Sequence, residues 1–187
     1  MTTITTMTMD TTTSTELELG ASWETAERPH ILVVGLGNLL LQDDGVGVHA
    51  VYALQQETPP GVCVADVGCA VLDALHLFEW ADKIIAIDAM QAGGAPGTVY
   101  TYREDDVADN PMPVSLHEVS IKAAFRFTDK PIAAEILFIG VEPDVIDYGL
   151  ELTPDVEAAM PTVLKAVRDM IGTWREQACP VLAGAAS

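Results

Sequence analysis

The sequence predicts a three-layer α/β protein, in which a twisted, mostly parallel sheet of about five strands lies between helices on both faces. Short apolar runs that end at Gly or Asp alternate along the chain with longer segments of helical period. The chain has 187 residues, and 49% of them are hydrophobic. This length and composition suit one domain with a sizeable core.

Strands are predicted where apolar residues run continuously and are bounded by turn residues. Four such runs indicate buried strands, over 31–34, 62–68, 83–90 and 135–143. The alternating segment 97–103 predicts an edge strand or a hairpin arm.

Helices are predicted over 45–57, 70–81, from Leu116 onward and from Pro154 onward. Ser115, with Glu118 three residues later, forms a capping box that starts the third of these helices. Thr153 and Pro154 are typical of the N-cap and first positions of the fourth, and Pro161 predicts a kink within it. Helical spacing assigns these residues to the core-facing sides: Val46, Ala50, Ala53, Leu54, Leu72, Leu75, Phe78 or Glu79, Val156, Ala159, Met160, Val163, Val167 and Met170.

The domain organisation follows from composition. Residues 1–28 are rich in Thr and acidic residues and lack an apolar period, so we expect a disordered tail. Residues 29–175 are expected to form a single α/β domain, followed by a frayed tail over 176–187. The N-terminus lacks the features of a signal peptide, and no apolar run approaches the roughly 20 residues of a membrane span. These observations predict a cytoplasmic protein without membrane attachment.

The charge balance excludes several classes of partner. Asp and Glu total 28 and Lys and Arg total 9, which gives a net charge of −19. Binding to nucleic acid or to an anionic membrane needs clustered basic residues, so neither is expected. Cys63, Cys69 and Cys179 form no C-x-x-C pair and are odd in number. This argues against a zinc ribbon or a disulfide framework and favours a reducing compartment.

The glycine-rich segment "GLGNLLLQDDGVGVHA", residues 35–50, does not fit a nucleotide-binding loop. Gly35 and Gly37 match the start of a dinucleotide fingerprint, but Leu40 stands where the third glycine should be. The Gly-Lys-Ser/Thr ending of a P-loop is absent from the sequence. Asp43 and Asp44 would also repel a phosphate at a helix N-terminus.

The same aspartates become candidates once the sheet is considered, because such folds bind ligands beyond the carboxyl ends of their strands. Asp43 and Asp44 follow the first strand, and one of them can serve as a helix cap. Asp88 closes the apolar run of the third strand. Its charge is costly to bury unless it is paired, hydrogen-bonded or bound to a cation, so capping of the next loop and ligand binding both remain open.

His117 is the third candidate. The capping box places it in the first turn of a helix, where the helix dipole favours the neutral imidazole that a metal ligand requires. Asp43 or Asp44, Asp88 and His117 would form an open site suited to Ni, Zn, Co or Mn, or an acid–base cluster without a metal. Asp66, at the end of the second strand, could support one of these side chains.

Six segments follow one another over roughly residues 30–172: "ILVVGLGNLLLQDDGVGVHAV", "DVGCAVLDAL", "KIIAIDAM", "PGTVYTYR", "SLHEVSIKAAFRF" and "IGVEPDVIDYGLELTPDVEAAMPTVL". In this order they resemble the NiFe-hydrogenase maturation endopeptidases. The resemblance implies a mostly parallel sheet between helices. It also implies an aspartyl-type endopeptidase that removes the C-terminal extension of a hydrogenase large-subunit precursor after nickel insertion.

The resemblance further implies a metal site made by Asp44, Asp88 and His117, which would recognise nickel carried by the substrate. The purified protein is then expected to be empty or to hold another divalent metal. The family often has Glu where this chain has Asp44, so Asp43 stays an alternative ligand. The segments 35–37 and 93–97 are expected to let the substrate peptide approach the backbone. The alternative function is a non-cleaving metal-checkpoint protein or chaperone for hydrogenase assembly.

Overall fold

The computed structural model of the chain describes residues 29–103, 121–128 and 131–178. The tail predicted over 1–28, the capping box and His117 lie outside the described residues. No helix in the described part of the chain is long and apolar enough to cross a membrane.

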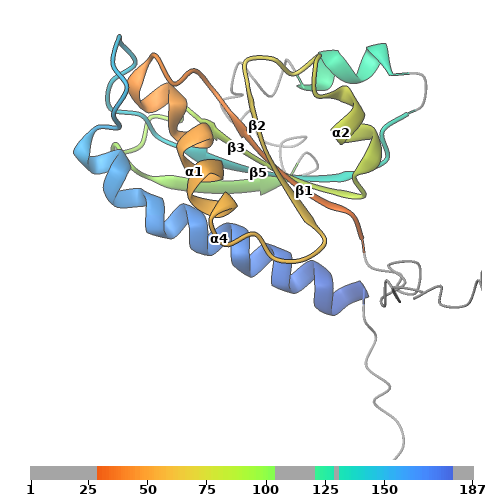
Figure 1. Cartoon of the computed structure of the whole chain (residues 1–187). Coiled ribbons are helices and arrows are strands. Elements are labelled where there is room, and N and C mark those ends of the chain that lie inside the picture. Colours follow the sequence, from red (N-terminus) through yellow and green to blue (C-terminus); the bar gives the residue numbers. More distant parts are fainter. Residues whose placement is uncertain (1–28, 104–120, 129–130, 179–187) are drawn as a thin grey trace, which may run out of the picture.

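A five-stranded sheet in the order β2-β1-β3-β5-β4 forms the centre of the molecule (Figure 1). The strands β2 (Val62–Gly68), β1 (Ile31–Leu36), β3 (Lys83–Ala89) and β5 (Glu135–Val141) are parallel. The edge strand β4 (Val99–Arg103) pairs with β5 in the antiparallel sense. The predicted fold class and the predicted edge strand are therefore confirmed.

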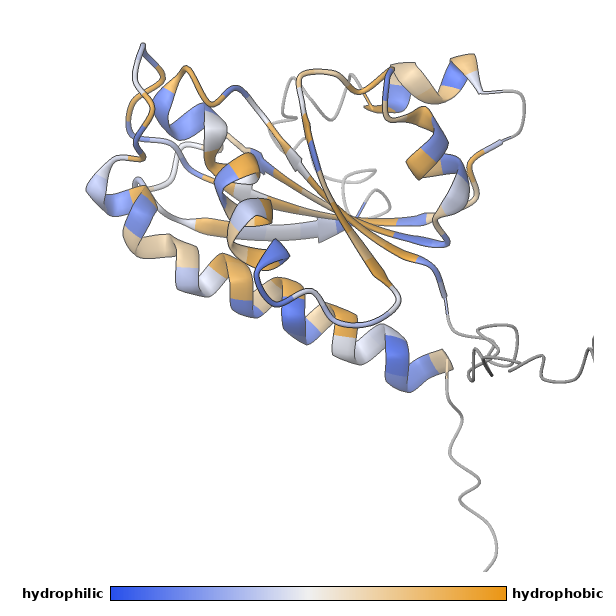
Figure 2. Cartoon of the chain, in the orientation of Figure 1, coloured by the Kyte–Doolittle hydropathy of each residue, from blue (hydrophilic) through white to orange (hydrophobic). Residues whose placement is uncertain are grey.

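Helices cover both faces of the sheet, as the continuous apolar strands require. The helices α1 (Val46–Gln55) and α4 (Pro154–Ala178) pack on one face, where they share a core with Ile31, Val33 and Ile85. The short helix α2 (Leu75–Trp80) and the helical residues 121–124 pack on the other, against Leu32, Val34 and Ile84. In Figure 2 the sheet is coloured mainly as hydrophobic, in keeping with this burial on both sides.

The structure corrects the predicted helix over 70–81. Residues 70–74 form successive turns, in which Asp73 N–H donates to Ala70 O and Ala74 N–H to Val71 O, and α2 begins only at Leu75. These turns rotate the apolar face relative to a regular helix. Val71 is consequently buried, whereas Leu72, assigned to the core from helical spacing, is 59% exposed.

The other predicted elements agree more closely with the structure. β1 continues two residues past the predicted strand, because Gly35 still pairs with Asp66 of β2 and Ile87 of β3. α4 begins at Pro154, runs through Pro161 and continues to Ala178, beyond the predicted start of the C-terminal tail at 176. Its buried residues are Val156, Ala159, Val163, Val167, Ile171 and Trp174, with Met160 and Met170 only half-buried.

Glycines let α1 rest directly on the sheet. A Cβ atom on Gly47 would lie 2.1 Å from Ile87 O and 2.5 Å from Leu36 O, and a Cβ on Gly35 would lie 2.2 Å from Gly47 O. Backbone thus meets backbone at the point where α1 crosses β1 and β3. This contact sets the height of the segment between β1 and α1 above the sheet edge.

Gly47→Ala should destabilise the fold by at least about 3 kcal/mol, because the added methyl group meets backbone atoms that cannot rotate away. Urea unfolding followed by circular dichroism measures the change. Gly172→Ala in α4 is the matched control, since a Cβ there meets nothing within 4 Å. That change should stabilise the protein by up to about 1 kcal/mol through helix propensity. Equal effects of the two changes would contradict the close packing of α1.

Candidate functional site

The predicted carboxylates gather at the carboxyl edge of the sheet. Asp44 lies in η2 (Gln42–Gly45), a turn of 3-10 helix between β1 and α1, and is half-buried. Asp88 lies near the end of β3 and is only 4% exposed. Asp66 lies near the end of β2, level with Gly35 of β1. The parallel register therefore brings the three chain segments to one edge.

Strand alternation separates Asp66 from Asp88. On β3, Asp88 follows Ile87, which packs in the core beneath α1 and α4, so Asp88 faces the side of α2. On β2, Asp66 faces the side of α1, where Tyr52 Oη donates a 2.7 Å hydrogen bond to its Oδ2. The structure therefore gives Asp66 a partner on α1 and does not bring it to the side of Asp88, contrary to the prediction that it supports the site.

Cys69 was missed by the sequence analysis and lies beside the two remaining carboxylates. The Cys69 thiol donates to Gly37 O at 3.6 Å, in the turn that contacts the Asp44 backbone. Burial raises the pKa of this thiol, and the negative charges of Asp44 and Asp88 raise it further. Cys69 follows β2 directly, so the rule of the carboxyl edge could have identified it. It also lines a pocket of about 470 Å³ with Val71, Ala124 and other mainly apolar residues.

Asp43 has a different environment from Asp44. It is fully buried, and its Oδ1 accepts a 2.7 Å hydrogen bond from Thr153 N–H. Its Oδ2 accepts three more, from Asp144 N–H at 2.9 Å, Val145 N–H at 3.0 Å and Thr153 Oγ1 at 2.8 Å. Burial alone would raise the pKa of Asp43, but these hydrogen bonds together lower it below 3.8. The hydroxyl of Thr153, the residue that the sequence predicts as the N-cap of α4, thus donates to Asp43.

Asp44, in contrast, accepts one backbone hydrogen bond among the described residues, from Asn38 N–H to Oδ2 at 2.8 Å. Gly37 allows this turn, because its φ is 107° and a Cβ would lie 1.7 Å from Asp44 O. The Asn38 side chain in turn accepts a hydrogen bond from Leu40 N–H. The turn therefore fixes the backbone under Asp44, and its hydrogen bond within the described residues occupies only one of the two carboxylate oxygens.

Another buried carboxylate, Glu142, orders the loop that follows Asp88. Its oxygens accept hydrogen bonds from the N–H groups of Ala92, Gly93 and Gly94, and from Tyr100 Oη. Burial opposes ionisation, but these bonds prevail and lower the pKa of Glu142 below 4.5. Glu142 was not among the residues predicted from the sequence, although its position directly after the buried strand β5 is a signal for a functional or structural carboxylate.

Most glycines of segments 35–37 and 93–97 are required by close packing within the protein itself. A Cβ at Gly35, Gly37, Gly94 or Gly97 would lie within 2.4 Å of another atom of the protein. Gly93, with φ of 83°, has no such neighbour within 4 Å. The predicted approach of a substrate peptide to these segments is therefore compatible with open space at Gly93, whereas the other four are explained by close packing.

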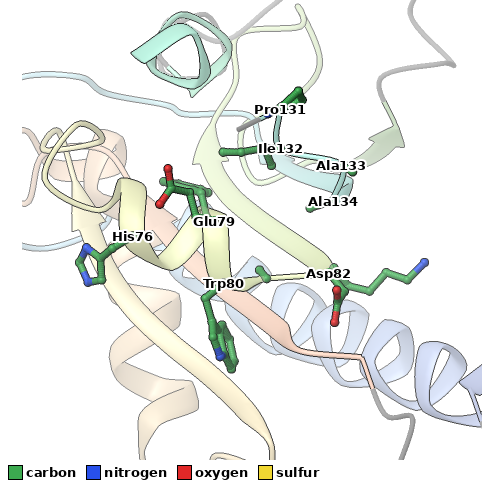
Figure 3. Close-up of a pocket in the computed structure, with 11 residues that line it drawn as sticks. His76, Glu79, Trp80, Asp82, Pro131, Ile132, Ala133 and Ala134 are labelled. Carbon is green, nitrogen blue, oxygen red and sulfur yellow. The ribbon is translucent and has the colours of Figure 1, made fainter. Parts of the chain in front are cut away.

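A larger pocket of about 830 Å³ lies at the opposite edge of the sheet (Figure 3). Its lining residues precede β3 and β5, which makes this the amino-terminal edge, and they are His76, Phe78, Glu79, Trp80, Ala81, Asp82, Lys83 and 131–134. It is thus separate from the carboxylates.

Within the described residues, no three His, Cys, Asp or Glu side chains are grouped as a metal site, and His117 lies outside that part of the chain.

The fold and the acidic carboxyl edge define an open-sheet α/β protein whose site suits a cation or a peptide better than a phosphate. A family model described as hydrogenase maturation protease matches residues 48–170. The hydrogenase 2 maturation protease of Escherichia coli is 34% identical over 150 residues, covering 74% of this chain and 91% of that protein. The chain belongs to the hydrogenase maturation protease family, which confirms the resemblance seen in the sequence.

Other relatives agree with this assignment. The hydrogenase expression/formation protein HupM of Azotobacter chroococcum is 33% identical over 166 residues, covering 81% of this chain and 79% of that protein. The solved structure of the hydrogenase maturating endopeptidase HybD from Escherichia coli superposes with a TM-score of 0.67. It is 32% identical and covers 77% of this chain and 93% of that chain.

Asp43→Asn should destabilise the fold by about 2–4 kcal/mol, because the amide offers one oxygen where four donors converge and places N–H groups against them. Asp44 is half-buried and its carboxylate accepts one backbone hydrogen bond, so Asp44→Asn should lower the free energy of unfolding by less than about 1 kcal/mol. Urea unfolding of both variants measures the difference. Equal losses of stability would show that Asp43 does not hold the segment after β1 to the loop after β5.

The stability of the protein should fall in acid as Asp43 and Glu142 gain protons. The folded-state pKa of each lies below its ordinary value of 3.8 or 4.5, so each contributes stability above that value and loses it as the pH falls through the folded pKa. Thermal unfolding between pH 6 and pH 2 measures this decline. In Asp43→Asn the decline below pH 3.8 should be shallower than in the parent, and an identical slope would contradict the assignment.

Proposed function

We propose that this protein is an endopeptidase that removes the C-terminal extension of a NiFe-hydrogenase large-subunit precursor after nickel insertion. The observation that carries the proposal is that the adjacent aspartates Asp43 and Asp44 have different hydrogen-bonding environments. Asp43 is committed to the fold by four hydrogen bonds, whereas Asp44 is half-buried and accepts a single backbone hydrogen bond, from Asn38 N–H. The family membership and the names of the relatives support the same activity.

Asp44 and Asp88 are the carboxylates that we assign to nickel recognition. Two negative charges in one partly buried neighbourhood repel each other, and a divalent cation between them relieves that repulsion. Oxygen and imidazole donors suit nickel among other borderline metals. We treat the nickel as cargo of the substrate, so the site would be completed only when a loaded precursor binds.

His117 is the third proposed ligand, and its assignment comes from the sequence. A helix that begins at Leu116 would place His117 on the same face as Ile121, four residues later. Ile121 is fully buried in the core on the α2 side of the sheet, which is the side that Asp88 faces. This placement would put the imidazole on the side of the sheet that Asp88 faces.

Nickel recognition and cleavage can then share one site. Contact of Asp44, Asp88 and His117 with the inserted nickel would report that the metal is present. It would also hold the scissile peptide bond close to the metal, where its carbonyl could be polarised or a water could be activated. A carboxylate beside the scissile bond can accept a proton from an attacking water. We place this reaction in the cytoplasm, as the sequence indicates.

Asp44→Ala, Asp88→Asn and His117→Ala should each slow trimming of a nickel-loaded precursor at least about 100-fold, because each removes a proposed ligand. Intact-mass spectrometry of the precursor follows the reaction. Asp66→Asn is the matched control, since it changes a carboxylate at the next strand end that faces α1, and it should retain activity within about threefold. A nickel-free precursor should not be trimmed by the parent.

Two outcomes would change the proposal. If Asp88→Asn and His117→Ala trim the precursor at the rate of the parent, the site is assigned wrongly. If the parent binds the loaded precursor and never trims it, the protein is the non-cleaving checkpoint or chaperone that the substitution of Asp44 for the common Glu leaves as the alternative.

A further inference from the structure

Five large apolar side chains are exposed together on two adjoining loops at the carboxyl edge. They belong to the loop before η2 and to the loop between β5 and α4, and we call them the apolar loop patch: Leu40, Val145, Ile146, Tyr148 and Leu150. Tyr148 is 87% exposed, Leu150 64% and Leu40 59%, while Val145 and Ile146 are each more than a third exposed. Figure 1 shows the second loop projecting in blue beside the orange segment before α1, and Figure 2 colours part of it as hydrophobic.

Hydrogen bonds hold the two loops in a fixed arrangement. Gln42 N–H donates to Gly149 O and Gly149 N–H donates to Leu40 O, both at 3.1 Å, and Asp43 N–H donates to Val145 O at 3.3 Å. A close approach at Gly149 supports this pairing, because a Cβ there would lie 2.6 Å from Gln42 Cγ. The exposed side chains are thus presented from an ordered backbone, which lowers the entropic cost of binding a partner.

The apolar loop patch adjoins the proposed site through one residue. The Asp43 carboxylate binds the N–H groups of Asp144 and Val145 on the inner side of the loop. The next residue along the chain is Asp44, one of the proposed nickel ligands. A macromolecule whose metal reached Asp44 would therefore meet the apolar loop patch with a neighbouring part of its surface.

The charges around the patch indicate the kind of partner. Asp144, Asp147 and Glu151 lie within or beside it and are exposed. A symmetric pairing of two copies through this patch would bring these acidic side chains together, in a chain of net charge −19. A different protein, with an apolar centre and basic residues around it, fits better.

We propose that the apolar loop patch is the docking surface for the folded body of the large-subunit precursor, which it contacts outside the extension that is cleaved. This inference rests on the proposed function. Apolar contacts at Tyr148 and Leu150 would supply affinity, and the acidic residues would orient a basic margin of the partner. The site itself would then need to hold only the nickel and the scissile peptide.

The test compares the double variant Tyr148→Ser, Leu150→Ser with the parent, using full-length nickel-loaded precursor. The KM for trimming should rise at least about tenfold with kcat little changed, because docking is lost and the site is intact. Trp80→Ser is the control, since Trp80 is an exposed aromatic at the opposite edge, and its KM should match that of the parent. Circular dichroism checks that each variant is folded.

If the KM of the double variant equals that of the parent, the proposal of a docking surface is overturned, while the proposed function stays intact. If the parent does not trim the precursor, the proposed function fails, and equilibrium binding of the precursor to the parent and the double variant then tests the patch alone. Sedimentation equilibrium provides the remaining outcome. A dimer of the parent that dissociates in the double variant would assign the patch to a second copy of this chain and overturn the proposal.

Discussion

The buried carboxylate of Asp43 is the interaction on which the carboxyl edge of this protein depends. It joins the segment after β1 to a loop about a hundred residues later and to Thr153, immediately before α4. A buried carboxylate is stable only when its oxygens are hydrogen-bonded, and here four donors satisfy it. The start of η2, the loop after β5 and the start of α4 are consequently fixed by one side chain.

Close backbone packing and strand alternation determine which carboxylates can act together. Gly47 lets α1 contact β1 and β3 directly, so the segment that carries Asp44 lies low over the end of Asp88's strand. Alternation along β2 and β3 then directs Asp66 to the α1 side and Asp88 to the α2 side. Proximity along a sheet edge is thus insufficient for a shared site, because the side chains must also face the same side.

The sequence was informative where a single local pattern decides the structure. Continuous apolar runs located the strands, and their carboxyl ends located Asp44 and Asp88. It failed where the outcome depends on tertiary contacts. The turns before α2 left Leu72 exposed, and Tyr52 binds the Asp66 carboxylate on the α1 side, where strand alternation places it. The position of Glu142 after β5 marks it as a candidate, but the N–H groups that it binds lie about fifty positions earlier in the chain, so no local spacing reveals these hydrogen bonds.

The choice between Asp43 and Asp44 shows how a fold can resolve an ambiguity that a motif cannot. Both residues are acidic, adjacent and at a strand end, and both could cap a helix or bind a cation. A carboxylate whose two oxygens already accept four hydrogen bonds would have to give up several of them to bind a metal. Asp44 accepts one such bond within the described part of the chain. The lower cost of exchanging its partners is the physical reason for proposing Asp44, and not Asp43, as the nickel ligand. The hydrogen bonds of Asp43 keep Asp44 and the apolar loop patch in a constant relation.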